Sequence, residues 1–138
     1  MEGLLIGSPN PLLLPIHLIT FGIKRVWSGQ IEMPKADHYI DCRSVANPCY
    51  KLHGTGDDSS VQAWVKAHTE AGADEMYAFV EEAIQRLPIR RGPQWNMKPF
   101  VIGCFCAHGI HRSRSIAYLM KAKMEEMGYQ DVSITQKL

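Results

Sequence analysis

The sequence lacks a strong charge of either sign, since 15 Lys and Arg residues nearly balance 14 Asp and Glu residues, for a formal charge of +1. Without a global basic field, the composition gives no argument for a protein that binds nucleic acid through its overall charge. Hydrophobic residues make up 46% and charged residues 21% of the 138 residues, which argues against a disordered chain. The length is that of one ordinary domain with a single core.

Cysteine and uninterrupted apolar runs are also scarce. The cysteines are Cys42, Cys49, Cys104 and Cys106. They form no C-x-x-C pair, which indicates free thiols in a reducing compartment. Segment 1–15 is apolar, but Gly and Pro interrupt it and no basic stretch precedes it, which argues against a signal peptide or a membrane span. We therefore expect a cytoplasmic protein with no membrane partner, in which 1–15 is an irregular lead-in to a domain over 16–138.

The pattern of apolar residues predicts a small α/β fold. Short apolar or β-branched runs predict strands over 16–23, 38–43, 100–105 and 132–135. Amphipathic spacing predicts helices over about 61–68, 74–87 and 113–127. Segment 24–35 contains Gly29 and Pro34 and is predicted to be a loop. The order of these elements indicates a small, mostly parallel sheet of about four strands with helices packed on it.

One stretch joins the third predicted strand to the last predicted helix. From Cys106 to Ser113 it reads C-x5-R-S, between an apolar run and an amphipathic one. A turn of this length at a helix start directs backbone N–H groups at one point, where the helix dipole favours negative charge. Arg112 adds a planar fork that matches a phosphate, and Gly109 lets the backbone approach the anion. The stretch therefore predicts a phosphate-binding loop.

Two kinds of function suit such a loop. In a cysteine-dependent phosphohydrolase, Cys106 would be the nucleophile and Arg112 the phosphate clamp, and an aspartate such as Asp58 would protonate the leaving group. No aspartate is compelling from its position, so we expect binding without catalysis. The residues expected to contact the ligand within the loop are Cys106, Ala107, His108, Gly109, Ile110, His111, Arg112 and Ser113. A third interpretation is a protein-interaction domain in which segment 1–15 docks on a partner.

Several of these residues have alternative roles. Ser113 either caps the helix or donates a hydrogen bond to the Cys106 sulfur. Asp41 and Arg43 end the second predicted strand, where open α/β sheets gather ligand contacts, and they either contact the ligand or pair with each other. The soft metal ligands near the loop are Cys104, Cys106, His108 and His111. Their spacing matches no usual zinc site, so we expect no metal and no cofactor.

The tryptophans carry a separate expectation. Trp27, Trp64 and Trp95 are expected to pack in the domain rather than to stack on bases, because no basic run interleaves them.

Four motifs, in order, resemble the C-terminal domain of the RNase adapter protein RapZ family, over most of the chain from Ile16 onward. The matching residues are Phe21-Gly22-Ile23-Lys24 for F-G-x-K, Asp41-Cys42-Arg43 with Asn47-Pro48 for D-x-R-x-x-x-N-P, Thr55-Gly56 with Asp58 and Val61 for T-G-x-D-x-x-V, and Cys106 to Ser113 for C-x-x-G-x-H-R-S. Four ordered motifs are more specific than one, and His111 favours this family over general cysteine phosphatases.

The resemblance implies an adapter that senses an amino-sugar phosphate, binds small regulatory RNA and presents it to an endoribonuclease. It implies that the loop holds the phosphate without turning it over. The residues that it carries over are Cys106, Gly109, His111 and Arg112 as ligand contacts, and Asp41, Arg43 and Asn47 as the rim of the site. RNA and a ribonuclease are expected as partners through the resemblance alone, and a homo-oligomer is left open.

The chain departs from the family's pattern at several points. The family's N-terminal nucleotide-binding, kinase-like domain has no counterpart, so the resemblance predicts a stand-alone module or a fragment. Cys49 stands where the family commonly has His, and His108 where the loop usually has Gly. The family's basic C-terminal tail is absent, which bears on RNA binding.

Overall fold

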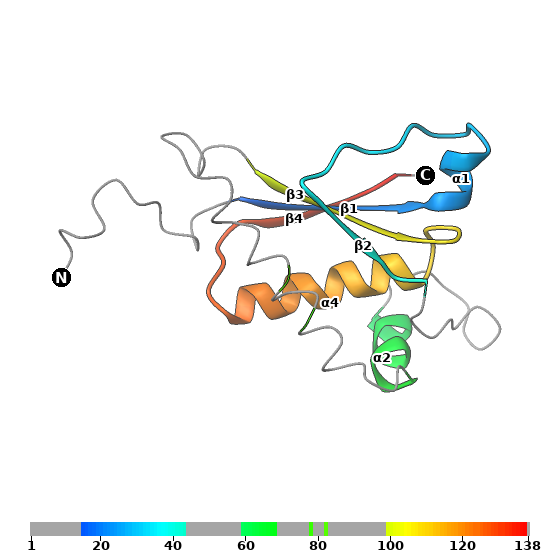
Figure 1. Cartoon of the computed structure of the whole chain (residues 1–138). Coiled ribbons are helices and arrows are strands. Elements are labelled where there is room, and N and C mark those ends of the chain that lie inside the picture. Colours follow the sequence, from blue (N-terminus) through cyan, green and yellow to red (C-terminus); the bar gives the residue numbers. More distant parts are fainter. Residues whose placement is uncertain (1–14, 44–58, 69–77, 79–81, 83–98, 138) are drawn as a thin grey trace.

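A computed structural model of the chain describes residues 15–43, 59–68, 78, 82 and 99–137, and the structural statements below refer to these residues. The strands are β1 (Ile16–Gly22), β2 (His38–Asp41), β3 (Phe100–Cys106) and β4 (Val132–Gln136), and the helices are α1 (Ile23–Trp27), α2 (Ser59–His68) and α4 (Arg112–Glu126) (Figure 1).

The four strands form one sheet in the order β2-β3-β1-β4, and every neighbouring pair is parallel. The predicted α/β class and the small four-stranded sheet are therefore confirmed. Because all strands are parallel, their carboxyl ends meet at one edge of the sheet, the edge at which such folds place ligands. Gly22, Asp41 and Cys106 end β1, β2 and β3 at this edge.

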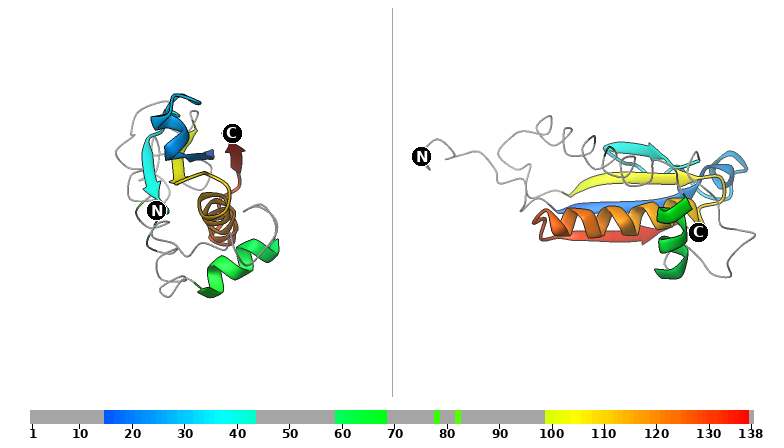
Figure 2. Two further views of the ribbon diagram at one scale, coloured as in Figure 1. Left: turned by 90° about the vertical axis from the view of Figure 1, so that its right-hand side faces the viewer. Right: turned by 90° about the horizontal axis from the view of Figure 1, so that it is seen from below.

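The core lies between the sheet and α4. Helix α4 packs against β1, β3 and β4, and α2 packs against α4. Figures 1 and 2 show α2 beside the N-terminal end of α4. Alternate strand residues face this layer, among them Leu18 and Ile102, which are fully buried. Met120 and Met124 of α4 fill the space above them, whereas Met127 is exposed.

An aromatic group covers the sheet on its other side. The ring of Phe21 lies edge-on to Tyr39, with centroids 6.3 Å apart, and 5.6 Å from the ring of Phe105. The Tyr39 hydroxyl donates to the carbonyl oxygen of Pro34, which ties the segment before β2 to the strand. The carboxylate of Asp37 accepts the Val101 N–H at 2.8 Å. These contacts hold the short strand β2 against β3.

The structure differs from the sequence-based prediction after β1. Residues 16–23 were predicted as strand and 24–35 as loop, but β1 ends at Gly22 and helix α1 follows at once. The Lys24 N–H donates to Ala107 O at 3.1 Å, which turns the chain into this short helix. The expectation that Trp27 packs is also wrong, because this residue is 67% exposed. Trp64, by contrast, packs partly buried against the core.

The other predicted elements agree to within a few residues. Strand β3 includes Cys106, helix α4 begins one residue early at Arg112, and β2 ends at Asp41. Of the predicted helix 74–87, only residues 78 and 82 are described, and both are helical. The rest of it, residues 1–14 and Trp95 lie outside the described residues. Within the described part of the chain, no helix combines the length and apolarity needed to cross a membrane.

Candidate functional site

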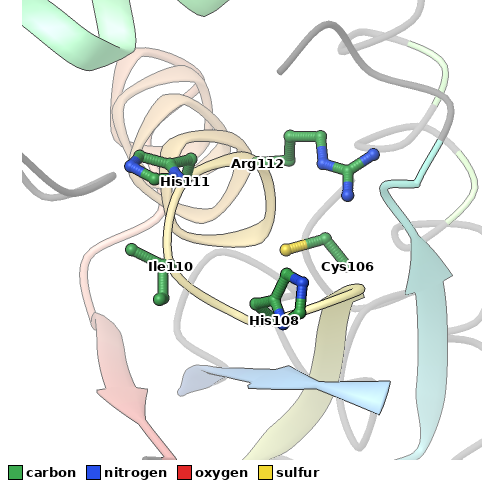
Figure 3. A pocket seen from close by; sticks show the side chains of 5 residues that line it. All are labelled: Cys106, His108, Ile110, His111 and Arg112. Carbon is green, nitrogen blue, oxygen red and sulfur yellow. The ribbon is translucent and has the colours of Figure 1, made fainter. Parts of the chain in front are cut away.

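Strand β3 delivers Cys106 to the carboxyl edge of the sheet, and after five intervening residues the chain enters α4 at Arg112 (Figure 3). The turn between them encloses a small pocket with a cavity volume of about 20 Å³, partly open to solvent. The residues that line it are Cys106, His108, Ile110, His111 and Arg112. All five were predicted ligand contacts. The pocket is smaller than the roughly 300–1,000 Å³ of sites that take whole drug-sized ligands, so it suits a single small group.

The sulfur of Cys106 is held by the middle of the loop and by the first turn of α4. The Gly109 N–H donates to Cys106 Sγ at 3.2 Å, and the thiol contacts Ser113 Oγ at 3.3 Å. Gly109 has φ +75°, a left-handed conformation that brings its N–H to the sulfur and favours glycine. Ser113 contacts the sulfur, but as the acceptor of a hydrogen bond from the Cys106 thiol and not as the donor considered above. The N-cap of α4 is His111, with no side-chain capping bond.

The loop also packs directly on the end of β1. A Cβ on Gly22 would lie 2.5 Å from the carbonyl carbon of His108, and a Cβ on Gly109 would lie 2.5 Å from Gly22 N. The buried Arg114 donates its Nε–H to Gly109 O at 2.9 Å. Sequence reasoning did not assign Gly22 or Arg114 to the site. The available signals were the F-G-x-K motif around Gly22 and the position of Arg114 two residues after Arg112.

Arg112 connects the loop to strand β2. Its Nη1 donates to Arg43 O at 2.6 Å. The Arg43 guanidinium forms a two-pronged pair with the Asp41 carboxylate, with Nη2 to Oδ2 at 2.7 Å and Nε to Oδ1 at 2.9 Å. It also lies 5.5 Å from the centroid of the Phe105 ring, a cation–π distance. Of the two roles considered for Asp41 and Arg43, pairing with each other is the one observed.

The charge state of Asp41 follows from this pairing. The hydrogen bond from Arg43 holds the pKa of the Asp41 carboxyl below its ordinary value of 3.8, and the charge of Arg112 acts in the same direction. Asp41 is therefore ionised at neutral pH. Arg112 and the Asp41–Arg43 pair together join the loop after β3 to the end of β2.

The other described cysteines belong to the core. Burial raises the pKa of the Cys104 thiol to about 12, and burial also raises the pKa of Cys42 well above its ordinary value. His108 is exposed and His111 half-buried at the pocket. In the described ranges, no three His, Cys, Asp or Glu side chains are arranged to hold a metal ion. Asn47, Cys49 and Asp58 lie outside the described residues.

Comparison with known proteins extends these observations. The family model described as the RapZ C-terminal domain matches residues 14–137. A protein of Clostridioides difficile (strain 630) described as a nucleotide-binding protein is 31% identical over 132 residues, covering 91% of this chain and 42% of that protein. The chain thus spans less than half the length of this relative. The description of nucleotide binding applies to the relative as a whole.

Proposed function

Because the chain belongs to the family of RapZ C-terminal domains, we propose that it is a non-catalytic sensor that binds the phosphate group of a small ligand, of the amino-sugar-phosphate type. The phosphate would lie in the loop from Cys106 to Ser113. One observation carries this proposal: Cys106, His111 and Arg112 line a single small pocket at the start of a 15-residue helix.

The physical basis is the concentration of positive potential at this point. The N-terminal end of α4 carries the positive end of the helix dipole. The guanidinium of Arg112 offers a planar fork suited to phosphate oxygens. His108 and His111 flank the pocket and supply ring N–H groups. Because the pocket is small, only the phosphate would enter it, and the exposed His108 would contact the remainder of the ligand.

The test is ligand-induced thermal stabilisation. Inorganic phosphate and an amino-sugar phosphate should raise the melting temperature, and the unphosphorylated sugar should not. A ligand present at 100 times its Kd stabilises the native state by about 2.7 kcal/mol. Arg112→Ala should abolish the shift. No shift in the unmodified chain at millimolar phosphate would contradict the proposal.

A matched control lies on the same helix. Lys121 is a cation nine residues further along α4, about 13 Å along the helix axis, and it pairs with Glu125 at 2.5 Å. Lys121→Ala removes the same charge without touching the pocket, so it should retain the full phosphate shift.

The contacts of the Cys106 sulfur favour a second candidate, a cysteine-dependent phosphohydrolase with Arg112 as the phosphate clamp. The Gly109 N–H donates to the sulfur and would stabilise a nucleophilic thiolate. The Ser113 hydroxyl accepts from the thiol and would donate to the sulfur once the thiol has lost its proton. This candidate takes Asp58 as the proton donor to the leaving group, and Asp58 lies outside the described residues. Asp41 cannot take that role, because the hydrogen bond from Arg43 lowers its pKa and keeps it ionised. A panel of phosphomonoesters tests it. Turnover that disappears in Cys106→Ser would establish catalysis, and turnover that survives would exclude Cys106 as the nucleophile.

RNA and an endoribonuclease are part of the proposal as partners. Helix α1 supports the RNA component, since Lys24, Arg25 and the exposed Trp27 lie at the same edge of the sheet as the loop. Cations and an exposed aromatic plane are the groups that bind single-stranded RNA. A gel-shift titration should show binding that weakens with salt and with Lys24→Ala. Absence of binding at low salt would contradict this component, and light scattering on the same sample measures whether the chain self-associates.

The buried free thiols support a location. Cys42, Cys104 and Cys106 are free cysteines that form no disulfide, and free thiols are typical of a reducing compartment. We include a cytoplasmic location in the proposal, and fractionation of cells that express the tagged protein tests it.

A further inference from the structure

Cys42 and Cys106 lie side by side at the carboxyl edge of the sheet. Cys42 directly follows β2, and its N–H donates to Phe105 O at 2.7 Å, which continues the β2–β3 ladder by one residue. In that ladder Ile40 pairs with Cys104 and Asp41 with Phe105. The next pair in register is therefore Cys42 with Cys106. Both side chains belong to the buried cluster beneath α4.

Their spacing suits a disulfide. Neighbouring strands are about 4.8 Å apart, within the range of about 4.4–6.8 Å between the Cα atoms of bridged cysteines. The Cβ atoms must approach to about 3.5–4.5 Å, a shift of about 0.3–1.3 Å from the strand spacing. Cys42 lies beyond the last residue of β2, where such a shift disturbs little of the ladder.

Cys104 is excluded as a partner by the same geometry. It is two residues before Cys106 on β3, which is about 6.6 Å along the strand. Its Cα is therefore about 8 Å from that of Cys42, too far for a disulfide. Within β3, the Cβ atoms of Cys104 and Cys106 are about 6.6 Å apart, which also exceeds the bonding range.

We propose that Cys106 is a peroxide-sensitive thiol and that Cys42 is its disulfide partner. Cys106 is 2% exposed, but it is the one cysteine among the pocket-lining residues, and its sulfur is directed into the loop (Figure 3), so the pocket would be the route of a small oxidant to it. The Gly109 N–H, 3.2 Å away, is directed at the sulfur and supports the charge of an attacking thiolate. Cys42 is fully buried next to it in the ladder, and its thiol, now 3.9 Å from Ile40 O, would turn toward Cys106 to resolve the oxidised sulfur.

The chemistry balances with hydrogen peroxide as the oxidant. The Cys106 sulfur attacks one peroxide oxygen, the O–O bond breaks, and the departing hydroxide takes up a proton to become water. Cys106 is then a sulfenic acid, oxidised by two electrons. The Cys42 sulfur attacks the Cys106 sulfur, the S–S bond forms and the S–O bond breaks. The leaving hydroxide takes the Cys42 proton, so two thiols and one peroxide give one disulfide and two waters.

Oxidation would disable the loop. A disulfide draws Cys106 Sγ toward Cys42 and away from Gly109 N and Ser113 Oγ, the two contacts that shape the pocket floor. The pairing of the cysteines depends on the sheet register, and it does not require that the pocket binds phosphate. The effect of oxidation on ligand binding does rest on the proposed function.

The experiment uses the full chain with Cys49→Ser, which leaves Cys42, Cys104 and Cys106. After treatment with hydrogen peroxide and alkylation of the remaining thiols, non-reducing peptide mapping identifies the disulfide. We expect loss of two thiols, a Cys42–Cys106 peptide pair, and full recovery of both thiols with dithiothreitol. Cys104→Ala, the matched core control, should form the same disulfide.

Variants of Cys42 separate the two steps. Cys42→Ala should form no disulfide and should accumulate a Cys106 sulfenic acid that dimedone traps, and Cys42→Ser gives the same test if the alanine variant fails to fold. A disulfide that contains Cys104 would overturn the proposal. The proposal would also be overturned if Cys42 and Cys106 of the folded chain stay reduced at a peroxide dose that oxidises the same thiols in the urea-unfolded chain.

Ligand binding is read separately from thiol chemistry. The phosphate-induced shift in melting temperature should be lost in the oxidised chain and restored by reduction. A disulfide that forms while phosphate still shifts the oxidised chain would overturn the regulatory role. If the reduced chain shows no phosphate shift at all, the proposed function fails, whereas the disulfide is still decided by the peptide masses.

Discussion

Replacement of Gly109 by alanine tests whether the loop depends on its close contact with β1. At φ +75°, an L-residue costs about 1–2 kcal/mol. The new Cβ would lie 2.5 Å from Gly22 N and 2.6 Å from Phe21 C. Both are backbone atoms at the end of a strand paired on both sides, so overlap with them costs about 1–3 kcal/mol more. We expect Gly109→Ala to lower the free energy of unfolding by about 2–5 kcal/mol.

Substitutions at two other glycines separate the cost of the positive φ from the cost of the overlap with backbone atoms. Gly29 has φ +81° with nothing within 4 Å of its Cβ position, so Gly29→Ala should cost about 1–2 kcal/mol from conformation alone. Gly22 lacks a positive φ, but its Cβ would lie 2.5 Å from the carbonyl of His108. Gly22→Ala should therefore cost about 1–3 kcal/mol from overlap alone. Because Gly22 and Gly109 face each other, the effects of their double substitution should not add.

Urea unfolding followed by circular dichroism measures these differences. With an m-value of about 2 kcal/mol per molar, a loss of about 2–5 kcal/mol moves the midpoint by about 1–2.5 M. The phosphate-induced thermal shift should disappear in Gly109→Ala and Gly22→Ala and remain in Gly29→Ala. The reasoning is refuted if Gly109→Ala is no more destabilised than Gly29→Ala, since the overlap with β1 would then be absent.

Three further predictions concern single side chains. Arg114→Met removes the donor to the buried Gly109 O and should lower the free energy of unfolding by about 1–3 kcal/mol in urea; an unchanged midpoint would show that this bond is not formed. The pKa of Asp41 is lowered in the folded chain, so its contribution to stability is present above pH 3.8 and is lost as the pH falls through the folded value. The difference in unfolding free energy between the unmodified chain and Asp41→Asn should therefore shrink on acidification from pH 6 to pH 2, and a constant difference would exclude the Arg43 pair as its cause. Burial raises the pKa of Cys104 to about 12, so iodoacetamide at pH 8 should label Cys104 only as fast as the chain unfolds, and rapid labelling of the native chain would contradict its placement in the core.

The part of the fold that could be predicted from the sequence is the part encoded locally. The apolar run at Phe100–Cys106, the C-x5-R-S turn and the amphipathic run after it each specify their own structure, so β3, the loop and α4 were predicted almost to the residue. The predicted pocket residues came together because they are consecutive in sequence.

The contacts that could not be predicted depend on the order of the strands. Arg112 donates to Arg43 O because β2 lies next to β3, and nothing in either segment alone specifies that neighbour. Gly22 contacts the loop because β1 is the other neighbour of β3. Helix α1 was missed for a different reason. With five residues and Gly29 close behind, it has too few turns for an amphipathic period to be recognised. Its Trp27 is exposed because a helix of this length covers no part of the core.

The way the loop is fastened indicates where a ligand would act. Lys24 N–H and Arg114 donate hydrogen bonds to backbone carbonyls of the loop, and Gly22 packs closely against it. The backbone of the loop is therefore already fixed before a ligand enters the pocket. Among the described residues, Arg112 donates a hydrogen bond to Arg43 O. An anion in the pocket would compete with this carbonyl oxygen for the Arg112 guanidinium. Release of that bond would act on the Asp41–Arg43 pair at the exposed end of β2, while β3 and α4 keep their positions. Ligand binding would thus be transmitted to β2 with little rearrangement of the core, and a ligand can shift such an equilibrium only through its different affinity for the two arrangements. This division between a fixed loop and one displaceable arginine suits a sensor better than an enzyme, which needs Arg112 preorganised on the phosphate before the reaction begins.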